Sequence, residues 1–397
     1  MRVTLLSNGH GEDAVGASLA RAFLEASPGL ELRAFPTVGR GRAYEALGLP
    51  ILGPRREMPS GGWMMDTASA FWADLRAGFL PMTAVQMRDL GRLETDRLVV
   101  IGDIYALLLS TLVRTSARFY VQTLVSAHLW TPHRNRHRSQ GQTQDRPTRY
   151  PNRYFMERIS APERFLMRRV VRQSYVRDAL TAECLERYGL SVRALGNPML
   201  DALAYEALPV RLSKQAPVVA LLPGTRSYRE EALETMLETL HHWPEATGLV
   251  AWTGETLPSL AAWQWLEVAS NVWQGRHPSA HNPVYLCKNR FAGVLHAAQL
   301  VLGTAGTANE QAAALGRPVV SFPVLPLYSD AFVANQKRLL GDALSVCARD
   351  PVSLAQGLRG LWASSERYEQ AVQAGRARMG PAGGSAAIVR DILSRGL

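Results

Sequence analysis

The chain has 397 residues, of which 47% are hydrophobic and 20% charged, which excludes a disordered or fibrous protein and allows two buried cores. It begins MRVTLLSNGHGED, which lacks the regions of a secretion signal, and no run of about 18 uncharged apolar residues predicts a membrane-spanning helix. The net charge of +10 is compatible with binding to nucleic acid, to an anionic membrane or to an acidic substrate. Cys184, Cys287 and Cys347 are expected to be reduced thiols in a cytoplasmic protein.

Short β-branched runs alternate with segments of helical apolar spacing along the first half, a pattern typical of βαβ units around a parallel sheet. After the first run, Val15, Leu19 and Phe23 recur every four residues and predict a helix, whose start Asp13 caps or flanks. The strands predicted in this half are 2–7, 30–35, 98–101, 119–124 and 192–195.

Two stretches of the first half do not fit this repeat. Residues 61–80 contain Trp63, Phe71 and Trp72, which either contact an acceptor or pack in a core helix. Residues 133–177 hold 12 arginines, no lysine and three acids, so this segment carries +9 of the net charge. This favours one localised anionic contact over a generally basic surface, with a solvated or disordered loop as the alternative. The arginines expected at a membrane or acceptor are Arg134, Arg136, Arg138, Arg149 and Arg153.

The second half repeats the alternation after residues 196–217, a stretch with three prolines that predicts the interdomain linker. A stripe of Leu233, Met236, Leu237 and Leu240 predicts a helix with acidic residues in its first turn. We therefore expect an N-terminal domain at 1–200, a C-terminal domain at 210–380, and a helix at about 383–397 that packs back on the first domain. The strands predicted in this half are 218–222, 249–252, 284–287, 300–302, 319–322 and 344–347.

Three turns between a strand and a helix could bring backbone N–H groups to an anion at the positive end of a helix. The first turn contains Asn8, Gly9 and Gly11, and because it lacks the GxGxxG spacing it argues against a nicotinamide dinucleotide. His10 in this turn is a candidate general base or ligand contact, with a loop-stabilising histidine as the alternative.

The second turn, 223–226, follows the first strand of the second half. Gly224 permits the turn, Thr225 follows it, and Arg226 supplies a planar cationic fork suited to a diphosphate. A surface arginine without a ligand is the alternative. The place of this turn at the opening of the second half favours phosphate binding.

The third turn lies in LVLGTAGTANEQAAALGRPVVSFP, where a strand is expected to end at Gly303 and a helix to begin near Asn309. The helix amides and the Thr307 hydroxyl suit phosphate oxygens, and Glu310, expected in the first turn, suits two ribose hydroxyls or simply stabilises the helix. The pair 335–336 either returns to the same ligand or is an ordinary amide pair. The second-domain residues expected at the nucleotide sugar are Gly224, Thr225, Arg226, Gly303, Thr304, Gly306, Thr307, Glu310, Asn335 and Gln336.

These motifs resemble, over essentially the whole chain, the lipid-A-disaccharide synthase family of inverting glycosyltransferases. The family's LLPGSR and SGTAALE motifs resemble residues 221–226 and 306–310, and its GH-x-M-AD segment resembles 196–201. Its AGEASGD loop resembles 7–13, and its IDAPDF strand end, whose first aspartate is a candidate base, is similar to 100–106. The proline and second aspartate of that strand end are missing here, which indicates a divergent branch.

The resemblance implies an α/β fold of GT-B type, with two Rossmann-like domains whose parallel sheets face a cleft. It implies that the second domain binds a UDP-linked sugar and the first a lipid acceptor, with Asp103 as first and His10 as second candidate base. Arg226 and the helix start near Gly303 would meet the leaving diphosphate, so no metal or other cofactor is expected. The expected location is cytoplasmic, peripheral on the inner face of an anionic membrane.

Two other functions stay open at this point. A sugar-nucleotide epimerase shares the same fold and nucleotide loop but uses no acceptor. A nucleic-acid binder could use the arginine cluster, yet no recognised nucleic-acid-binding motif accompanies it, so no nucleic-acid partner is expected.

Overall fold

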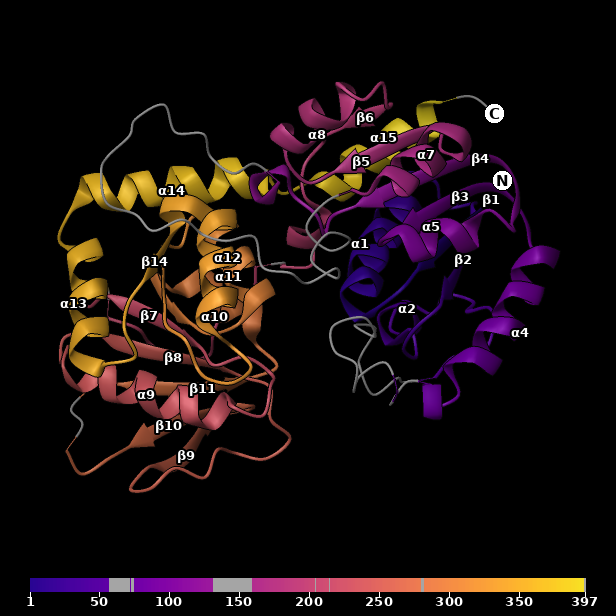
Figure 1. Cartoon of the computed structure of the whole chain (residues 1–397). Helices are drawn as coiled ribbons and strands as arrows, with labels where there is room; N and C mark the ends of the chain where they lie inside the picture. The colour runs from indigo at the N-terminus through magenta and orange to yellow at the C-terminus, as the bar shows by residue number, and fades with distance from the viewer. Residues whose placement is uncertain are drawn as a thin grey trace. The chain divides into compact units, whose positions relative to one another are not determined.

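The chain forms two compact units, each an α/β body with its own sheet (Figure 1). Unit 1 consists of Met1–Ala202 and Gly380–Leu397, and unit 2 of Leu203–Met379, so the change of unit falls inside the proline-containing stretch 196–217. The computed structural model describes residues 1–56, 72, 75–130, 159–203, 205–213, 215–279 and 282–395.

The sheet of unit 1 has the strand order β2-β1-β3-β4-β5-β6, and all its neighbours are parallel. Its central strands are buried along nearly their whole length, as expected for a parallel sheet covered on both faces. β5 was not predicted, because QSYV contains only one β-branched residue. The strands are β1 (Arg2–Ser7), β2 (Glu31–Pro36), β3 (Glu94–Ile101), β4 (Arg114–Gln122), β5 (Gln173–Val176) and β6 (Val192–Arg193).

Helices cover both faces of this sheet. α1 and α15 lie side by side on one face and share a core with β1 and β3, into which Phe23 and Ile388 are fully packed (Figure 1). Residues of α5 and α7 pack in a second core on the other face, while one large apolar side chain of each helix, Leu108 and Phe165, is exposed. The helices are α1 (His10–Ala26), α2 (Arg42–Glu45), α4 (Phe79–Arg92), α5 (Ile104–Ser110), α7 (Ala161–Val170), α8 (Ala179–Glu186) and α15 (Gly384–Ser394).

The sheet of unit 2 has the order β14-β13-β12-β7-β8-β11-β10-β9. Its last two strands form an antiparallel hairpin, which was not predicted because each of them contains a single β-branched residue, Val268 and Val272. The strands are β7 (Val218–Leu222), β8 (Thr247–Trp252), β9 (Gln264–Ala269), β10 (Val272–Arg276), β11 (Val284–Lys288), β12 (Leu300–Gly303), β13 (Val319–Ser321) and β14 (Leu344–Val346).

The helices of unit 2 flank this sheet. The stripe predicted on α9 is confirmed, since Leu233, Met236, Leu237 and Leu240 are all buried in the largest core of the unit. The helices are α9 (Arg229–His241), α10 (Phe291–Ala297), α11 (Gly306–Ala314), α12 (Asp330–Leu340), α13 (Pro351–Trp362), α14 (Ser365–Met379).

Each sheet reverses its strand order beside its first strand. In unit 1 the chain adds β2 on one side of β1 and then crosses to add β3 on the other side. In unit 2 it adds β8 and β11 on one side of β7 and later adds β12 on the other. Ligands of open α/β sheets bind at the carboxyl ends of the strands where this reversal occurs, so a ligand is expected at the turns after β1, β3, β7 and β12.

Candidate functional site

Asn8 and Asp103 join the two strand ends at the reversal point of unit 1. The Asn8 Nδ2 donates to Asp103 Oδ1 at 2.8 Å, and the same oxygen caps α5 by accepting from the N–H of Tyr105 at 2.9 Å. Gly102 has φ +138°, and a Cβ there would lie 2.0 Å from Asn8 Oδ1, so a glycine is required for this close approach. No donor among the described residues reaches Asp103 Oδ2, which leaves that oxygen for a ligand.

Carboxyl groups crowd this strand end. Burial raises the pKa of Asp103, and its hydrogen bonds from backbone amides and Asn8 oppose that rise. Burial raises the pKa of Glu12, on the first turn of α1, to about 7, and the negative charges of Asp103 and Asp13 add to the effect. A carboxyl whose pKa is near 7 can both take and give a proton at neutral pH.

Asp13 lies in the first turn of α1, so of the two predicted roles it flanks the helix start and does not cap it. The helix begins at His10, directly after Gly9. Asp13 is 2% exposed and accepts a hydrogen bond from Ser7 Oγ at 2.6 Å, and burial raises its pKa to about 7. Asp13 therefore ties α1 to the end of β1, and Gly11 occupies an exposed position in the first helical turn.

Glu163 is a buried carboxyl of this region that the sequence analysis counted only as a charge. It is 2% exposed, and it accepts from Tyr120 Oη at 2.8 Å and Gln122 Nε2 at 3.4 Å. Tyr120 Oη also lies 3.0 Å from the carbonyl of Gly102, next to Asp103. Burial raises the pKa of Glu163 to about 7, and the signal that could have indicated this residue is the Ser160 cap three positions earlier.

The structure brings together the two predicted turns of unit 2. β7 and β12 are neighbours, Thr304 Oγ1 donates to the Pro223 carbonyl at 3.3 Å, and Tyr228 Oη donates to the Thr304 carbonyl at 2.8 Å. Gly224 adopts φ +84°, which favours glycine, and its Cα faces Ala305. These contacts hold both turns at one edge of the sheet.

Thr225 and Arg226 are exposed at this edge. The Arg226 guanidinium makes no hydrogen bond or ion pair with the residues that the structure describes. α11 begins at the same edge, and Thr307 in its first turn is exposed. A cation and the free N–H groups of a helix start thus lie on adjacent turns, an arrangement suited to an anion.

α11 begins at Gly306, three residues before the predicted start. Ala305 is extended and leads directly into the helix, and Asn309 turns its side chain inward instead of capping. Glu310 consequently lies in the second turn, half-buried, and not in the first turn as predicted. Asn335 is also half-buried, on α12.

Gln336 lies beneath the α11 start. Its Nε2 donates to the Gly306 carbonyl at 2.9 Å, and its Oε1 accepts from Asn309 Nδ2 at 3.1 Å and Tyr328 Oη at 3.0 Å. It is 4% exposed. These hydrogen bonds give Gln336 a role in holding the turn, and its contact with a ligand stays a prediction.

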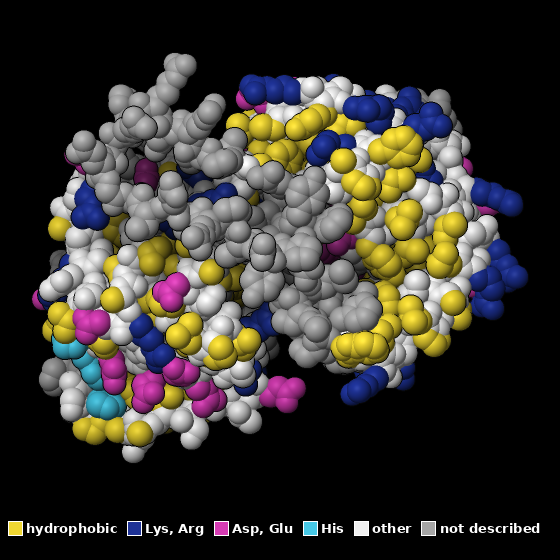
Figure 2. Space-filling model, viewed as in Figure 1, with side chains coloured by type: hydrophobic (Ala, Val, Ile, Leu, Met, Phe, Trp, Pro, Cys, Tyr) yellow, Lys and Arg dark blue, Asp and Glu magenta, His cyan; other side chains and the backbone are white. Residues whose placement is uncertain are grey.

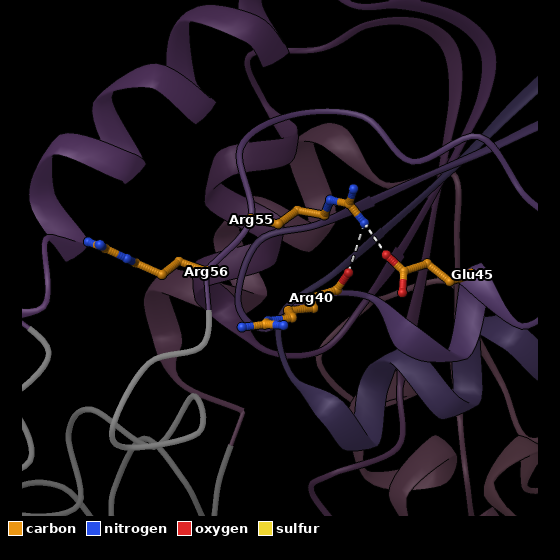
Figure 3. A pocket seen from close by; sticks show the side chains of 4 residues that line it. All are labelled: Arg40, Glu45, Arg55 and Arg56. Atoms are coloured by element: carbon orange, nitrogen blue, oxygen red, sulfur yellow. Dashed lines mark hydrogen bonds and ion pairs between the residues drawn. The ribbon is translucent and has the colours of Figure 1, made fainter.

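A hollow of about 380 Å³ beside the end of β2 is lined by Arg40, Glu45, Arg55 and Arg56 (Figure 3). Arg55 donates to the Glu45 carboxylate at 2.7 Å and to the Arg40 carbonyl at 2.9 Å, and Arg56 donates to the Ala77 carbonyl at 2.6 Å. Because Glu45 already balances Arg55, the hollow is a moderately basic surface feature of unit 1. No motif in the sequence indicated it.

Several predicted site residues lie outside the described part of the chain. Trp72 is described and is 59% exposed. Within the described ranges, no helix is both long and apolar enough to cross a bilayer, and no three metal-binding side chains gather in a group. The predicted features that fall outside are Trp63, Phe71, Arg134, Arg136, Arg138, Arg149, Arg153 and the side chain of His10.

Known proteins resemble the chain in structure and not in sequence. No protein-family model matches it, and no curated protein matches it in sequence. A provisionally assigned UDP-N-acetylglucosamine 2-epimerase from Listeria monocytogenes superposes with a TM-score of 0.60 at 13% identity, covering 99% of this chain and 96% of that one.

Two further solved structures match comparably. The UDP-GlcNAc 2-epimerase from Neisseria meningitidis bound to UDP-GlcNAc gives a TM-score of 0.54 at 13% identity, with both chains covered to 100%. CalG4, the calicheamicin glycosyltransferase, superposes with a TM-score of 0.58 at 15% identity, covering 99% of this chain and 98% of that one. The chain therefore has the GT-B-like fold, an α/β protein with two parallel-sheet domains that glycosyltransferases and epimerases share.

Proposed function

We propose that the chain is an inverting glycosyltransferase, which moves a sugar from a nucleotide diphosphate sugar to a lipid acceptor. The observation that carries this proposal is the chemical contrast between the two reversal points. The turns of unit 2 present a cation and helix N–H groups, whereas the strand ends of unit 1 present carboxyl groups. The first set suits an anionic leaving group, and the second suits removal of a proton.

The donor belongs to unit 2 in this proposal. Arg226 and the amides at the start of α11 contact the diphosphate, and Glu310 contacts the ribose. The solved structure bound to UDP-GlcNAc supports a UDP-linked sugar, because it shares the fold over its full length. Gln336 acts indirectly, by fixing the turn that carries the amides.

Asp103 is the base in the transfer step. Its free Oδ2 takes the proton of the acceptor hydroxyl, and the hydroxyl oxygen bonds to the anomeric carbon on the face opposite the diphosphate. The bond from that carbon to the diphosphate oxygen breaks, and the nucleoside diphosphate leaves with the electron pair. Arg226 and the α11 amides meet the growing charge, while the configuration at the carbon inverts.

The lipid nature of the acceptor rests on the resemblance of the sequence motifs to lipid-A-disaccharide synthases. The proline and the second aspartate of the family's motif are missing after Asp103, so we do not expect this chain to use the same acceptor as that family. We propose a related lipid with a free hydroxyl, reached by a protein that lies on the inner face of a membrane.

A sugar-nucleotide epimerase is the second candidate, and the crowd of carboxyls in unit 1 favours it. Removing a proton from a sugar carbon and returning one on the other face needs an acid and a base, and Asp103 and Glu12 offer both. The fold shared with the UDP-GlcNAc 2-epimerase from Neisseria meningitidis is compatible with this function.

Acceptor dependence separates the two functions. The protein is incubated with UDP-sugars alone and then with a lipid extract of the organism that encodes it. A transferase releases UDP in step with glycosylated lipid and only when lipid is present. Formation of an epimeric UDP-sugar without added lipid would exclude transfer as the main activity.

A further inference from the structure

Large hydrophobic side chains stand in solvent on three helices of unit 1. An exposed apolar group on a soluble protein is ordinary when it is single and informative when it is part of a patch. We name this patch the apolar face and define it by five side chains. They are Leu80 (62% exposed) and Met87 (46%) on α4, Leu108 (55%) and Leu112 (36%) on and after α5, and Phe165 (59%) on α7.

The helices that carry the apolar face are neighbours. α5 contacts both α4 and α7, and Figure 2 shows hydrophobic side chains spread across the surface where these helices lie. Thr83 Oγ1 lies 3.3 Å from Tyr105 Oη, which places α5 against one flank of α4. Leu80 and Met87 stand three and four positions from Thr83, so they share that flank and border α5.

The helices that carry the apolar face bury other side chains, so the residues of the apolar face are not the ones that pack against the sheet. On α4 the buried residues are Phe79, Met82, Gln86 and Leu90, a separate stripe from the exposed pair. On α7 the buried residues are Glu163 and Met167, and Phe165 lies between them on the opposite side. The exposed set is thus a second apolar surface, additional to the one that packs on the sheet.

Arginines border the apolar face. Residues 75–92, 104–112 and 159–172 contain seven arginines, no lysine, and two acids. Of the acids, Glu163 is buried, and Asp89 pairs with Arg88 at 3.2 Å. Arg92 and Arg169 are exposed and form no ion pair within the described ranges.

We infer that the apolar face and its bordering arginines dock on an anionic lipid bilayer. Apolar side chains on a basic surface match the two layers of such a membrane, because the former enter the acyl boundary and the latter meet phosphates. The shortage of exposed acids on these helices removes the repulsion that an anionic surface would otherwise exert. The inference deepens the proposed function, since it identifies the surface that brings the enzyme to a lipid acceptor.

Vesicle co-sedimentation tests the inference without catalysis. The full chain is mixed with vesicles of phosphatidylcholine alone or of phosphatidylcholine with phosphatidylglycerol, at low and high salt. We expect binding to the anionic vesicles that falls with salt. Arg92→Gln and Arg169→Gln should each weaken binding about fivefold, the factor that corresponds to about 1 kcal/mol per basic residue at the surface.

The apolar part has its own variants and a matched control. Leu108→Ser with Phe165→Ser should weaken vesicle binding at least about tenfold, since each removes most of an inserted side chain. Leu266→Ser with Val268→Ser changes two comparably exposed side chains, 49% and 44%, on β9 of unit 2 and should leave binding unchanged. Unfolding curves of both pairs should match the unchanged protein, because all four side chains are exposed.

Three results would overturn the inference. They are no binding of the unchanged protein to anionic vesicles, equal loss in both serine pairs, and a change from dimer to monomer in Leu108→Ser with Phe165→Ser that leaves vesicle binding intact. The last result would assign the apolar face to a second copy of the chain. Failure of this inference can be distinguished from failure of the proposed function. If the protein binds vesicles but releases no UDP with detergent-dispersed lipid, the membrane-binding surface is supported and the transferase activity is not.

Discussion

Asp103 is held by one carboxyl oxygen and presents the other. Oδ1 accepts from Asn8 and from the backbone of α5, whereas Oδ2 has no donor among the described residues. A carboxyl fixed in this way keeps its orientation when it gains or loses a proton. This is the geometry that a general base requires.

Replacing Asp103 tests its role as the base. Asp103→Asn keeps an oxygen for the α5 cap but cannot take a proton, so we expect kcat to fall by about 10² to 10⁴ with little change in UDP affinity. Steady-state kinetics with lipid acceptor and an unfolding curve measure the two effects. Full turnover in a folded Asp103→Asn protein would show that another group is the base.

Asn8 should set the pH range of that base. Its amide stabilises the ionised form of Asp103, so Asn8→Ala raises the pKa of Asp103 further and moves the acidic limb of the kcat/KM profile to higher pH. A merely structural role would lower the whole profile without moving the limb. The pH profile therefore distinguishes positioning from folding.

Glu163 gives the stability of the protein a pH dependence. Its pKa is about 7 in the folded chain against an ordinary 4.5, so the folded state holds more protons than the unfolded state between these values. Its contribution to stability is full below pH 4.5 and is lost as the pH rises to about 7. A rise of the pKa from 4.5 to about 7 corresponds to about 3 kcal/mol at most.

Glu163→Gln removes this titration and keeps an acceptor for Tyr120. The variant should gain up to about 3 kcal/mol over the unchanged protein at pH 8 and little near pH 4.5. Urea unfolding at both pH values measures the difference, with Glu183→Gln, exposed on α8, as control. An identical stability difference at the two pH values would contradict the assignment.

At the scale of elements, the packing of α14 on α11 positions the predicted phosphate site. A Cβ at Gly375 of α14 would lie 2.2 Å from the carbonyl oxygen of Ala313 on α11. Because that neighbour is backbone, the two helices approach each other only with glycine there. α11 is the helix whose start faces the turn of Arg226.

Gly375→Ala should therefore destabilise unit 2 by about 1–3 kcal/mol through overpacking. Gly91→Ala is the matched control, because Gly91 also lies in a helix and a Cβ there meets nothing within 4 Å. The control should be neutral or gain about 0.5–1 kcal/mol. Chemical unfolding measures both, and equal stability of the two variants would refute the close approach.

Elements with a strong local signal could be predicted from the sequence. β1 and β7 occupy the predicted residues, because continuous runs of apolar residues mark strands that are covered on both faces. β5 is polar and short, and the β9–β10 hairpin relies on tryptophans over Gly275, so neither carries that signal. The start of α11 was misplaced because the inward turn of Asn309 depends on tertiary partners.

In the candidate site, too, some features could be predicted from the sequence and others could not. The turn of Gly224 and the position of Asp103 were indicated by motifs of neighbouring residues. The pairing of Asn8 with Asp103 and of Tyr120 with Glu163 could not be, since 95 and 43 residues separate the partners. Only the folded sheet brings these strand ends together.

At the scale of the whole molecule, the two units repeat one architecture with opposite chemistry. Each sheet reverses its order beside its first strand, and each reversal point lies where the motifs of the sequence fall. The fold is shared with both glycosyltransferases and epimerases, so it does not choose between them. The choice depends on the groups at the strand ends.

Binding of UDP to unit 2 is the premise that both candidate functions share. Isothermal titration calorimetry of the full chain with UDP tests it directly, with Arg226→Ala as the variant and Arg276→Ala, an exposed arginine on β10, as control. We predict that UDP binds, that Arg226→Ala weakens binding about tenfold to a hundredfold through loss of a charge-assisted contact, and that the control binds normally. No binding of UDP by the unchanged protein, or equal binding by Arg226→Ala, would contradict the account.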